Sequence, residues 1–185
     1  MDKLVAAMAV AVACSVALPA LATLLARHPN VRRALGVVLL VAYSCAYTVF
    51  TFYGRTAAPT ASFNLQPLWS WRASLTLAGG SLGVERPDLL LEIALNILLY
   101  LPLGCLLPLV LDGPAASRPR ATAADVLAVA LACSVLTELA QAFLHVGLCE
   151  LDDVLHNTFG ALVGYVLYRT VAFALQRWSQ ALQAR

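Results

Sequence analysis

Acidic side chains stand inside long apolar stretches of this sequence. Glu138 is the clearest case, because apolar residues surround it and its charge needs a partner. A carboxyl group in such a place can act as a general acid or base, and charges of this kind are candidates for function. The residues assigned to catalysis are Glu92, Glu138, His145 and Asp153. The residues assigned to substrate binding are Arg55, Arg72, Asn96, Gln141, Asp152 and Asn157.

The spacing of these residues predicts three polar helix faces. Residues four positions apart share a face of a helix, as Glu92 and Asn96 do. A second stripe, with spacings of four, three and four, consists of Ser134, Glu138, Gln141 and His145. A third consists of Asp153, Asn157, Gly160, Gly164 and Tyr168, with Asp152 and His156 beside it. Each predicted helix thus carries its polar groups along one side.

Two kinds of ligand chemistry suit this set of residues. Arg55 and Arg72 are cations that could hold a phosphate group. The carboxylates that could instead hold Mg²⁺ or Ca²⁺, hard cations that prefer oxygen ligands, are Glu92, Glu138, Asp152 and Asp153. No nucleophile motif identifies the reaction, so transfer and hydrolysis both stay open. The cofactor is therefore left unassigned, and no residue is assigned as a metal ligand.

The composition is that of a membrane protein. Of 185 residues, 61% are hydrophobic and 12% are charged, whereas soluble domains have about 45–50% apolar and about 25% charged residues. A soluble protein of this length could not bury so much apolar surface, and lipid is the alternative solvent. The net charge of +2 and the lack of a basic stripe with aromatic residues argue against nucleic acid as a partner.

The five cysteines give no support for a zinc or redox site, because the sequence contains no CxxC pair. Four of them lie in apolar runs, where they are expected to serve as small packing residues. Cys149 lies in a polar loop and is the thiol expected to be exposed.

Five apolar stretches are long enough, or nearly so, to cross a hydrocarbon core of about 30 Å at about 20 residues each. They lie at about 4–26, 34–53, 89–111, 125–144 and 154–175, with a polar-aromatic loop at 54–88. The prediction is an all-α bundle of about five transmembrane helices in a single membrane domain, 1–185. The run Ala20-Leu21-Ala22 resembles a signal-peptide cleavage site. We expect the first helix to be retained, because cleavage would leave three arginines outside, against the positive-inside bias.

The distribution of Lys and Arg predicts an N-out, C-in topology. The arginines in the loops and tail expected in the cytoplasm are Arg27, Arg32, Arg33, Arg118, Arg120, Arg177 and Arg185. In this topology the polar ends of the third, fourth and fifth helices all lie at the outer face. The long loop departs from the rule, since it would hold Arg55, Arg72 and Arg86 outside. The polar groups of four segments therefore converge on one side of the membrane.

These features also have purely structural interpretations. Asp152 or Asp153 could cap the fifth helix, and the Gly160–Gly164 pair is typical of close helix packing. Asn96 and Gln141 could form hydrogen bonds between helices. His145 and His156 could be ordinary solvated histidines at the membrane interface. Trp69 and Trp71 could anchor the chain at that interface. Clustering on one side counts against a purely structural protein, because interhelical hydrogen bonds have no reason to favour one face.

Motifs in a fixed order resemble those of VanZ-like membrane proteins. Residues 96–104, Asn-Ile-Leu-Leu-Tyr-Leu-Pro-Leu-Gly, are similar to the N-I-x-x-F-x-P-x-G run of that family. Residues 137–141 resemble its (S/T)-E-x-x-Q element, and residues 152–165 resemble its D-D-x-x-x-N-T-x-G-x-x-x-G-Y signature. Arg55 and the Asn-Leu-Gln-Pro-Leu run at 64–68 resemble an upstream R…N-L-x-P-F element. The resemblance covers about residues 54–168.

The resemblance implies a multi-pass protein of the bacterial cytoplasmic membrane. The founding member of the family is linked to resistance against teicoplanin-type antibiotics, a phenotype that we do not transfer to this chain. A distant grouping with enzymes that exchange or hydrolyse lipid head groups implies membrane lipids or lipid-linked cell-wall intermediates as partners. The expected function is therefore a head-group transferase or hydrolase with its site at the outer leaflet. The alternative is a non-catalytic protein that binds an envelope lipid or a glycopeptide and contributes to antibiotic resistance; the oligomeric state is left open.

Overall fold

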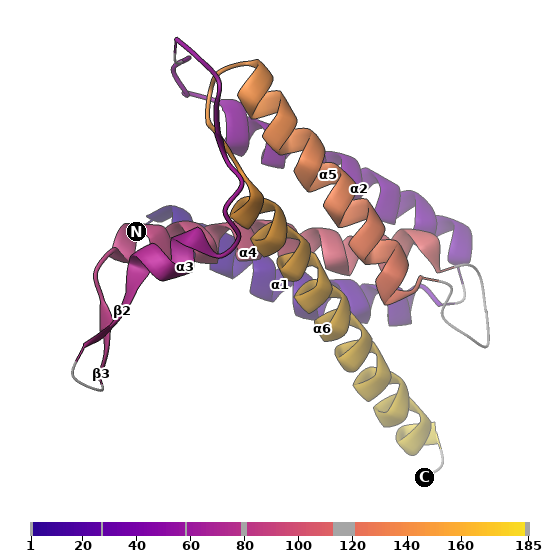
Figure 1. Ribbon diagram of the computed structural model, residues 1–185. Coiled ribbons are helices and arrows are strands. Elements are labelled where there is room, and N and C mark those ends of the chain that lie inside the picture. Colours follow the sequence, from indigo (N-terminus) through magenta and orange to yellow (C-terminus); the bar gives the residue numbers. More distant parts are fainter. Residues whose placement is uncertain (1, 27, 58, 79–80, 113–120, 184–185) are drawn as a thin grey trace.

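The computed structural model describes residues 2–26, 28–57, 59–78, 81–112 and 121–183 of the chain. The helices are α1 (Asp2–Leu24), α2 (Pro29–Phe52), α3 (Trp69–Ser74), α4 (Pro87–Leu111), α5 (Ala123–Phe143) and α6 (Leu151–Gln183). The strands are β1 (Ser62–Asn64), β2 (Leu75–Ala78), β3 (Ser81–Val84) and β4 (Leu148–Glu150). Figure 1 shows the long helices crossing one another in a bundle, with α3 and the β2–β3 hairpin at one edge.

Four of the described helices, α2, α4, α5 and α6, are long and apolar enough to cross a membrane. The apolar part of α1, Met8–Leu24, is shorter. The predicted all-α membrane bundle is therefore confirmed. The N-out, C-in topology stays a prediction, and part of its basis lies outside the described residues, namely Arg27, Arg118, Arg120 and Arg185.

α4 lies at the centre of the bundle and packs against α1, α2 and α6. Its sequence is apolar on every side, which is typical of a helix that is buried all round, and every residue of α4 from Tyr100 to Leu109 is buried. Pro102 lies in this stretch and cannot donate to the helix backbone. In the turn before it, the Tyr43 hydroxyl of α2 donates to the carbonyl oxygen of Leu99 at 2.8 Å. The neighbouring helix thus supplies a donor close to the proline.

Three glycines bring the backbones of α4 and α6 into direct contact. A Cβ atom on Gly160 or Gly164 of α6 would collide with the backbone of α4, at the carbonyl oxygens of Ile97 and Leu101. Gly104 of α4 meets the backbone of α6 in the same way. The GxxxG pair therefore serves close helix packing, as small residues do at helix interfaces in membranes.

The segment between α2 and α4 is more ordered than the single loop predicted at 54–88. It contains α3 and the antiparallel β2–β3 hairpin. Its strand β1 pairs in parallel with β4, so that Asn64 lies opposite Glu150. This pairing ties the segment to the connection between α5 and α6. It also fixes the position of Glu150 immediately before α6.

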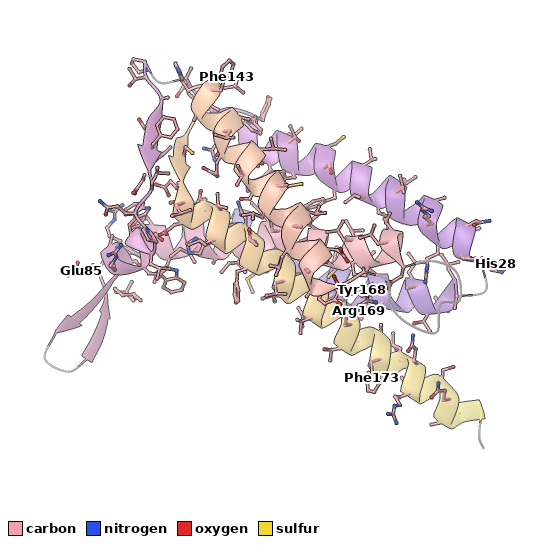
Figure 2. The ribbon with its side chains drawn as sticks, turned by 45° about the vertical axis from the view of Figure 1, so that its right-hand side comes forward. His28, Glu85, Phe143, Tyr168, Arg169 and Phe173 are labelled. Atoms are coloured by element: carbon pink, nitrogen blue, oxygen red, sulfur yellow. The ribbon has the colours of Figure 1, made fainter. Side chains whose placement is uncertain are left out.

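A polar cluster fastens the far end of α4 to its neighbours. Asp112, which follows α4, forms an ion pair with Arg169 of α6, with 2.5 Å between Oδ2 and Nη1. Arg169 also donates to the carbonyl oxygen of Ala121 at 2.7 Å, and the Ala121 N–H donates to Asp112. Arg32 of α2 donates to the Asp112 carbonyl oxygen. We call these four residues the Asp112 cluster; Figure 2 shows Arg169 and Tyr168 beside the opposite end of α5 from Phe143.

Candidate functional site

A cavity of about 500 Å³ opens at the end of the bundle away from the Asp112 cluster, and we call it the polar pocket. The C-terminal end of α5 meets the N-terminal halves of α4 and α6 there, together with β4. The predicted site residues that line the cavity are Arg55, Glu92, Asn96, Glu138, Gln141, Asp153 and Asn157. Residues far apart in the sequence are thus brought to one place. Tyr47, Trp69, Thr137 and Glu150 also line it.

Glu138 is buried, with 3% of its surface exposed. Arg55 and Arg72, the cations predicted to bind substrate, form no ion pair with it among the described residues. Instead, the backbone N–H of Glu150 donates to Oε2 of Glu138 at 2.9 Å. The strand β4 therefore holds this carboxyl group in place, and no described Lys or Arg forms an ion pair with it.

Glu150 lies beside Glu138 and is also buried, with 6% of its surface exposed. Burial raises the pKa of its carboxyl group to about 7, and the nearby Glu92, Glu138 and Asp152 add to this rise. A carboxyl group with such a pKa exchanges its proton near neutral pH. Glu150 was not among the site residues predicted from the sequence. Its position two residues before Asp152 indicates that it is near the site, but nothing in the sequence indicates its burial.

Three amide side chains line the polar pocket, and two of them form hydrogen bonds with other pocket or helix side chains. Asn96 donates to Oδ1 of Asp153 at 2.6 Å, and Asn157 donates to the Ser134 hydroxyl at 2.9 Å. Gln141 is buried, with 5% of its surface exposed, and its side-chain amide forms no hydrogen bond with any described residue. Its amide is not among the fully buried polar groups that lack a partner, and it lines the open pocket. Gln141 is therefore a group that a bound molecule could satisfy.

Asp152 has a different environment from Asp153. Its side chain is fully buried, and it accepts hydrogen bonds from the Leu68 N–H (2.5 Å) and from the N–H and hydroxyl of Ser70 (2.9 and 2.5 Å). These contacts fix the start of α3 on the first turn of α6. Asp152 does not line the polar pocket.

Two further candidates lie outside the polar pocket. Arg72 donates to the carbonyl oxygens of Pro67 and Leu68, at 2.5 and 3.3 Å, at the start of its own helix α3. His145 has a left-handed backbone, with φ of 57°, and lines an apolar hollow with Phe63 and Phe143. Arg55 is then the arginine that reaches the pocket, where it donates to the Val146 carbonyl oxygen at 3.4 Å.

A comparison with known families agrees with this geometry. The family model described as VanZ/LLP1 matches residues 34–173. The chain belongs to the VanZ/LLP1 family. The match confirms the resemblance found in the motifs and extends it over most of α2. A search of curated proteins found no match, and neither did a search of solved structures.

The part of this VanZ/LLP1 protein that matches the family contains every residue lining the polar pocket. Carboxylates outnumber cations there: Glu92, Glu138, Glu150 and Asp153 share the pocket with Arg55. Asp88, at the same cavity, is paired with Arg86 at 2.6 Å. The pocket therefore has an excess of acidic groups.

These carboxylates do not form a metal site in the part of the VanZ/LLP1 chain that the structure describes. No three His, Cys, Asp or Glu residues there are grouped so that they could hold a metal ion. A bound Mg²⁺ or Ca²⁺ needs several oxygen ligands from protein, water or phosphate. The residues present therefore do not fit a resident cation held by the protein alone.

The cysteines differ from the expectation. Cys149 is buried rather than exposed, because it lies in β4, which pairs with β1. Burial and the carboxylates of Glu138 and Asp153 raise the pKa of the Cys149 thiol. A thiol of this kind is a poor nucleophile. The exposed thiols of the described residues are Cys45 and Cys133, on apolar helices.

Proposed function

We propose that the polar pocket binds the head group of a membrane lipid or lipid-linked cell-wall intermediate and catalyses its transfer or hydrolysis. The observation that carries this proposal is the pair of buried carboxyl groups, Glu138 and Glu150, in an open pocket of a membrane protein. Enzymes tune carboxyl groups in this way for proton transfer near neutral pH. The family to which the chain belongs and its multi-pass helices support a substrate in the membrane.

The carboxyl groups divide the proton transfers of such a reaction. In transfer or hydrolysis, a carboxylate takes a proton from the attacking hydroxyl group or water. A protonated carboxyl group gives a proton to the oxygen that leaves. Glu138 and Glu150 are the pair for these steps, since the backbone of one residue holds the side chain of the other. Asp153, fixed by Asn96, and Glu92 complete the acidic wall.

The charge balance favours a head group that carries both a phosphate and an amine. Arg55 supplies the cation for a phosphate oxygen. The excess of carboxylates on the opposite walls suits an ammonium group. A lipid with a purely anionic head group would face repulsion in this pocket. We therefore expect ethanolamine-type lipids to bind better than glycerol-type ones.

We place the site at the outer leaflet of the bacterial cytoplasmic membrane, from the distribution of arginines in the loops. Arg72 and Arg86, which depart from the positive-inside rule, are engaged locally by loop carbonyl oxygens and by Asp88. Impermeant thiol labelling of single cysteines placed at Trp69 and Gly147 would test this orientation. Labelling in intact cells supports it, and labelling only after the membrane is opened contradicts it.

The decisive experiment compares Glu138→Gln with Glu85→Gln, an isosteric change at an exposed carboxylate outside the pocket. Each purified protein would be placed in lipid nanodiscs with phosphatidylethanolamine, and release of the head group would be followed. Loss of the general acid or base should slow turnover by about 10²–10⁴-fold, with binding retained. Glu85→Gln should leave both unchanged. Wild-type protein that binds the lipid without turnover would instead identify a non-catalytic binder, and absence of binding would refute the proposal.

A further inference from the structure

A second hollow lies between α2 and α5, within the parts of both helices that are apolar enough to span a membrane. Its volume is about 250 Å³, and we call it the α2–α5 groove. Ser44 of α2 faces Cys133 and Leu136 of α5 across it, and Leu103 of α4 forms its floor. Leu103 is buried, whereas the three wall residues are exposed. The groove is therefore open on the side away from α4.

The groove adjoins the polar pocket, because Tyr47 and Thr137 line both. The Tyr47 hydroxyl lies 3.3 Å from the Tyr100 hydroxyl and 3.4 Å from the Thr137 hydroxyl. Three hydroxyl groups thus mark the junction between an apolar hollow and a charged one. A membrane lipid has the same order of parts: a hydrocarbon chain, linking oxygens and a polar head group.

The helix packing leaves this groove open sideways. α2 packs against α4, and its contact with α5 is slight at most. In Figures 1 and 2 the two helices run alongside each other. Because both are long and apolar enough to span the membrane, the medium beside the groove is hydrocarbon rather than water. A lipid could therefore reach the polar pocket without leaving the bilayer.

We infer that the α2–α5 groove holds a hydrocarbon chain of the lipid whose head group occupies the polar pocket, and that this lipid enters between α2 and α5. The inference rests on the proposed function, which supplies the head-group site. A pocket for a whole drug-sized ligand has roughly 300–1,000 Å³. The smaller groove suits one segment of a chain, with the remainder in the bilayer. Tyr47 and Thr137 then meet the oxygens that link chain and head group.

Another apolar hollow does not meet the same requirement. It is lined by residues of α5, the strand β1 and the neighbouring loops, among them Phe63, Leu139, Phe143 and His145. None of its lining residues also lines the polar pocket. A chain in that hollow would leave its head group away from Glu138. The groove between α2 and α5 is therefore the chain site that the geometry supports.

Two native cysteines provide a matched test. Cys133 lines the groove, whereas Cys45 is exposed on α2 and lines neither the groove nor the polar pocket. The variant Cys45→Ser keeps Cys133 as its exposed thiol, and the variant Cys133→Ser keeps Cys45. Both, in phosphatidylglycerol nanodiscs, would be treated with N-cyclohexylmaleimide, a bulky reagent that enters membranes. Each would then be titrated with fluorescent phosphatidylethanolamine and with glycerophosphoethanolamine, the same head group without chains.

The label on Cys133 should weaken binding of the lipid by about tenfold or more and leave binding of glycerophosphoethanolamine unchanged. The label on Cys45 should change neither. Ser44→Trp, which fills the groove from the opposite wall, should repeat the effect, with Val49→Trp as a control on the exposed side of α2.

The outcomes separate the two proposals. If labelled Cys133 protein and Ser44→Trp bind the lipid as well as wild type does, the groove inference is overturned. Binding of glycerophosphoethanolamine that depends on Arg55 would then leave the proposed function standing. If wild-type protein binds neither probe, the head-group site itself is refuted, and the inference is refuted with it.

Discussion

The polar pocket and the Asp112 cluster lie towards opposite ends of α4, and both place charges in an apolar bundle. In the Asp112 cluster, an ion pair and several backbone hydrogen bonds engage the charges, and the side chains of Arg169 and Asp112 are only 22% and 15% exposed. In the polar pocket, four carboxylates share one arginine, and Gln141 has no partner among the described residues. Paired charges can join helices, whereas unpaired ones are costly unless a ligand or a proton satisfies them.

The largest effect on stability is expected in the Asp112 cluster. Arg169→Met would remove the ion pair between Arg169 and Asp112, and breaking a buried pair from one side costs about 3–5 kcal/mol. We expect the free energy of unfolding in detergent to fall by a value near the lower bound, because the pair is partly exposed. The double variant Asp112→Leu/Arg169→Met should recover much of the loss. A loss below about 1 kcal/mol in the single variant, as at exposed pairs, would contradict this role.

Asp152 lies next to the polar pocket but has its partners within the protein, so it should behave like the Asp112 cluster. Asp152→Asn replaces one of the two oxygens that accept these three hydrogen bonds with an NH2 donor, and the expected loss is about 1–3 kcal/mol. Hydrogen exchange should show faster exchange at the amides of Leu68 and Ser70. Asp153→Asn, one residue further on, is the control and should leave these two amides protected. Equal exchange in both variants would remove the distinction between the two aspartates.

The pH dependence of stability should reveal the carboxyl groups of the polar pocket that have no ion pair. The pKa of Glu150 is about 7 in the fold, against an ordinary value of 4.5, so the fold favours the protonated form. The contribution of Glu150 is therefore greatest below pH 4.5, falls as the pH rises to about 7 and then levels off. Glu150→Gln should flatten this part of the curve and be more stable than wild type at pH 8. A curve that is unchanged by Glu150→Gln would contradict the raised pKa.

The smallest change in stability is expected at Arg55, which gives a direct counterpart to Arg169→Met. Arg55 makes one long hydrogen bond, to the Val146 carbonyl oxygen. Arg55→Met should therefore change the free energy of unfolding by no more than about 0.5 kcal/mol. It should nevertheless weaken binding of glycerophosphoethanolamine, measured by calorimetry. A large loss of stability would mean that Arg55 is a structural cation like Arg169.

The sequence was most informative where a property repeats along a helix. The apolar runs at 89–111 and 125–144 correspond to α4 and α5, because uninterrupted hydrophobicity over about 20 residues is typical of a helix that spans a membrane. The run at 154–175 lies within α6, which continues to Gln183 because a helix does not end where its apolar part ends. The meeting of Glu92, Glu138 and Asp153 followed from helices that alternate in direction.

Contacts that depend on the 54–88 segment could not be read from the sequence. The β1–β4 pair has three residues on each strand, too few for an alternating pattern to be visible. Without knowledge of that pair, nothing in the sequence indicates that Glu150 and Cys149 are buried. Asp152 and Asp153 are identical in type and adjacent, yet one supports α3 and the other faces the pocket. Their difference arises from tertiary structure alone.

The glycine contacts between α4 and α6 have a mechanical consequence. Two helices whose backbones touch cannot slide or part without losing that fit over several turns, so they form a stiff spine. Asn96 and Asp153, joined across this spine, keep a constant separation. α2 has no such fit with α5. Thermal motion of the bundle should therefore be largest in the wall formed by α2 and α5, while Asn96 and Asp153 in the pocket move little.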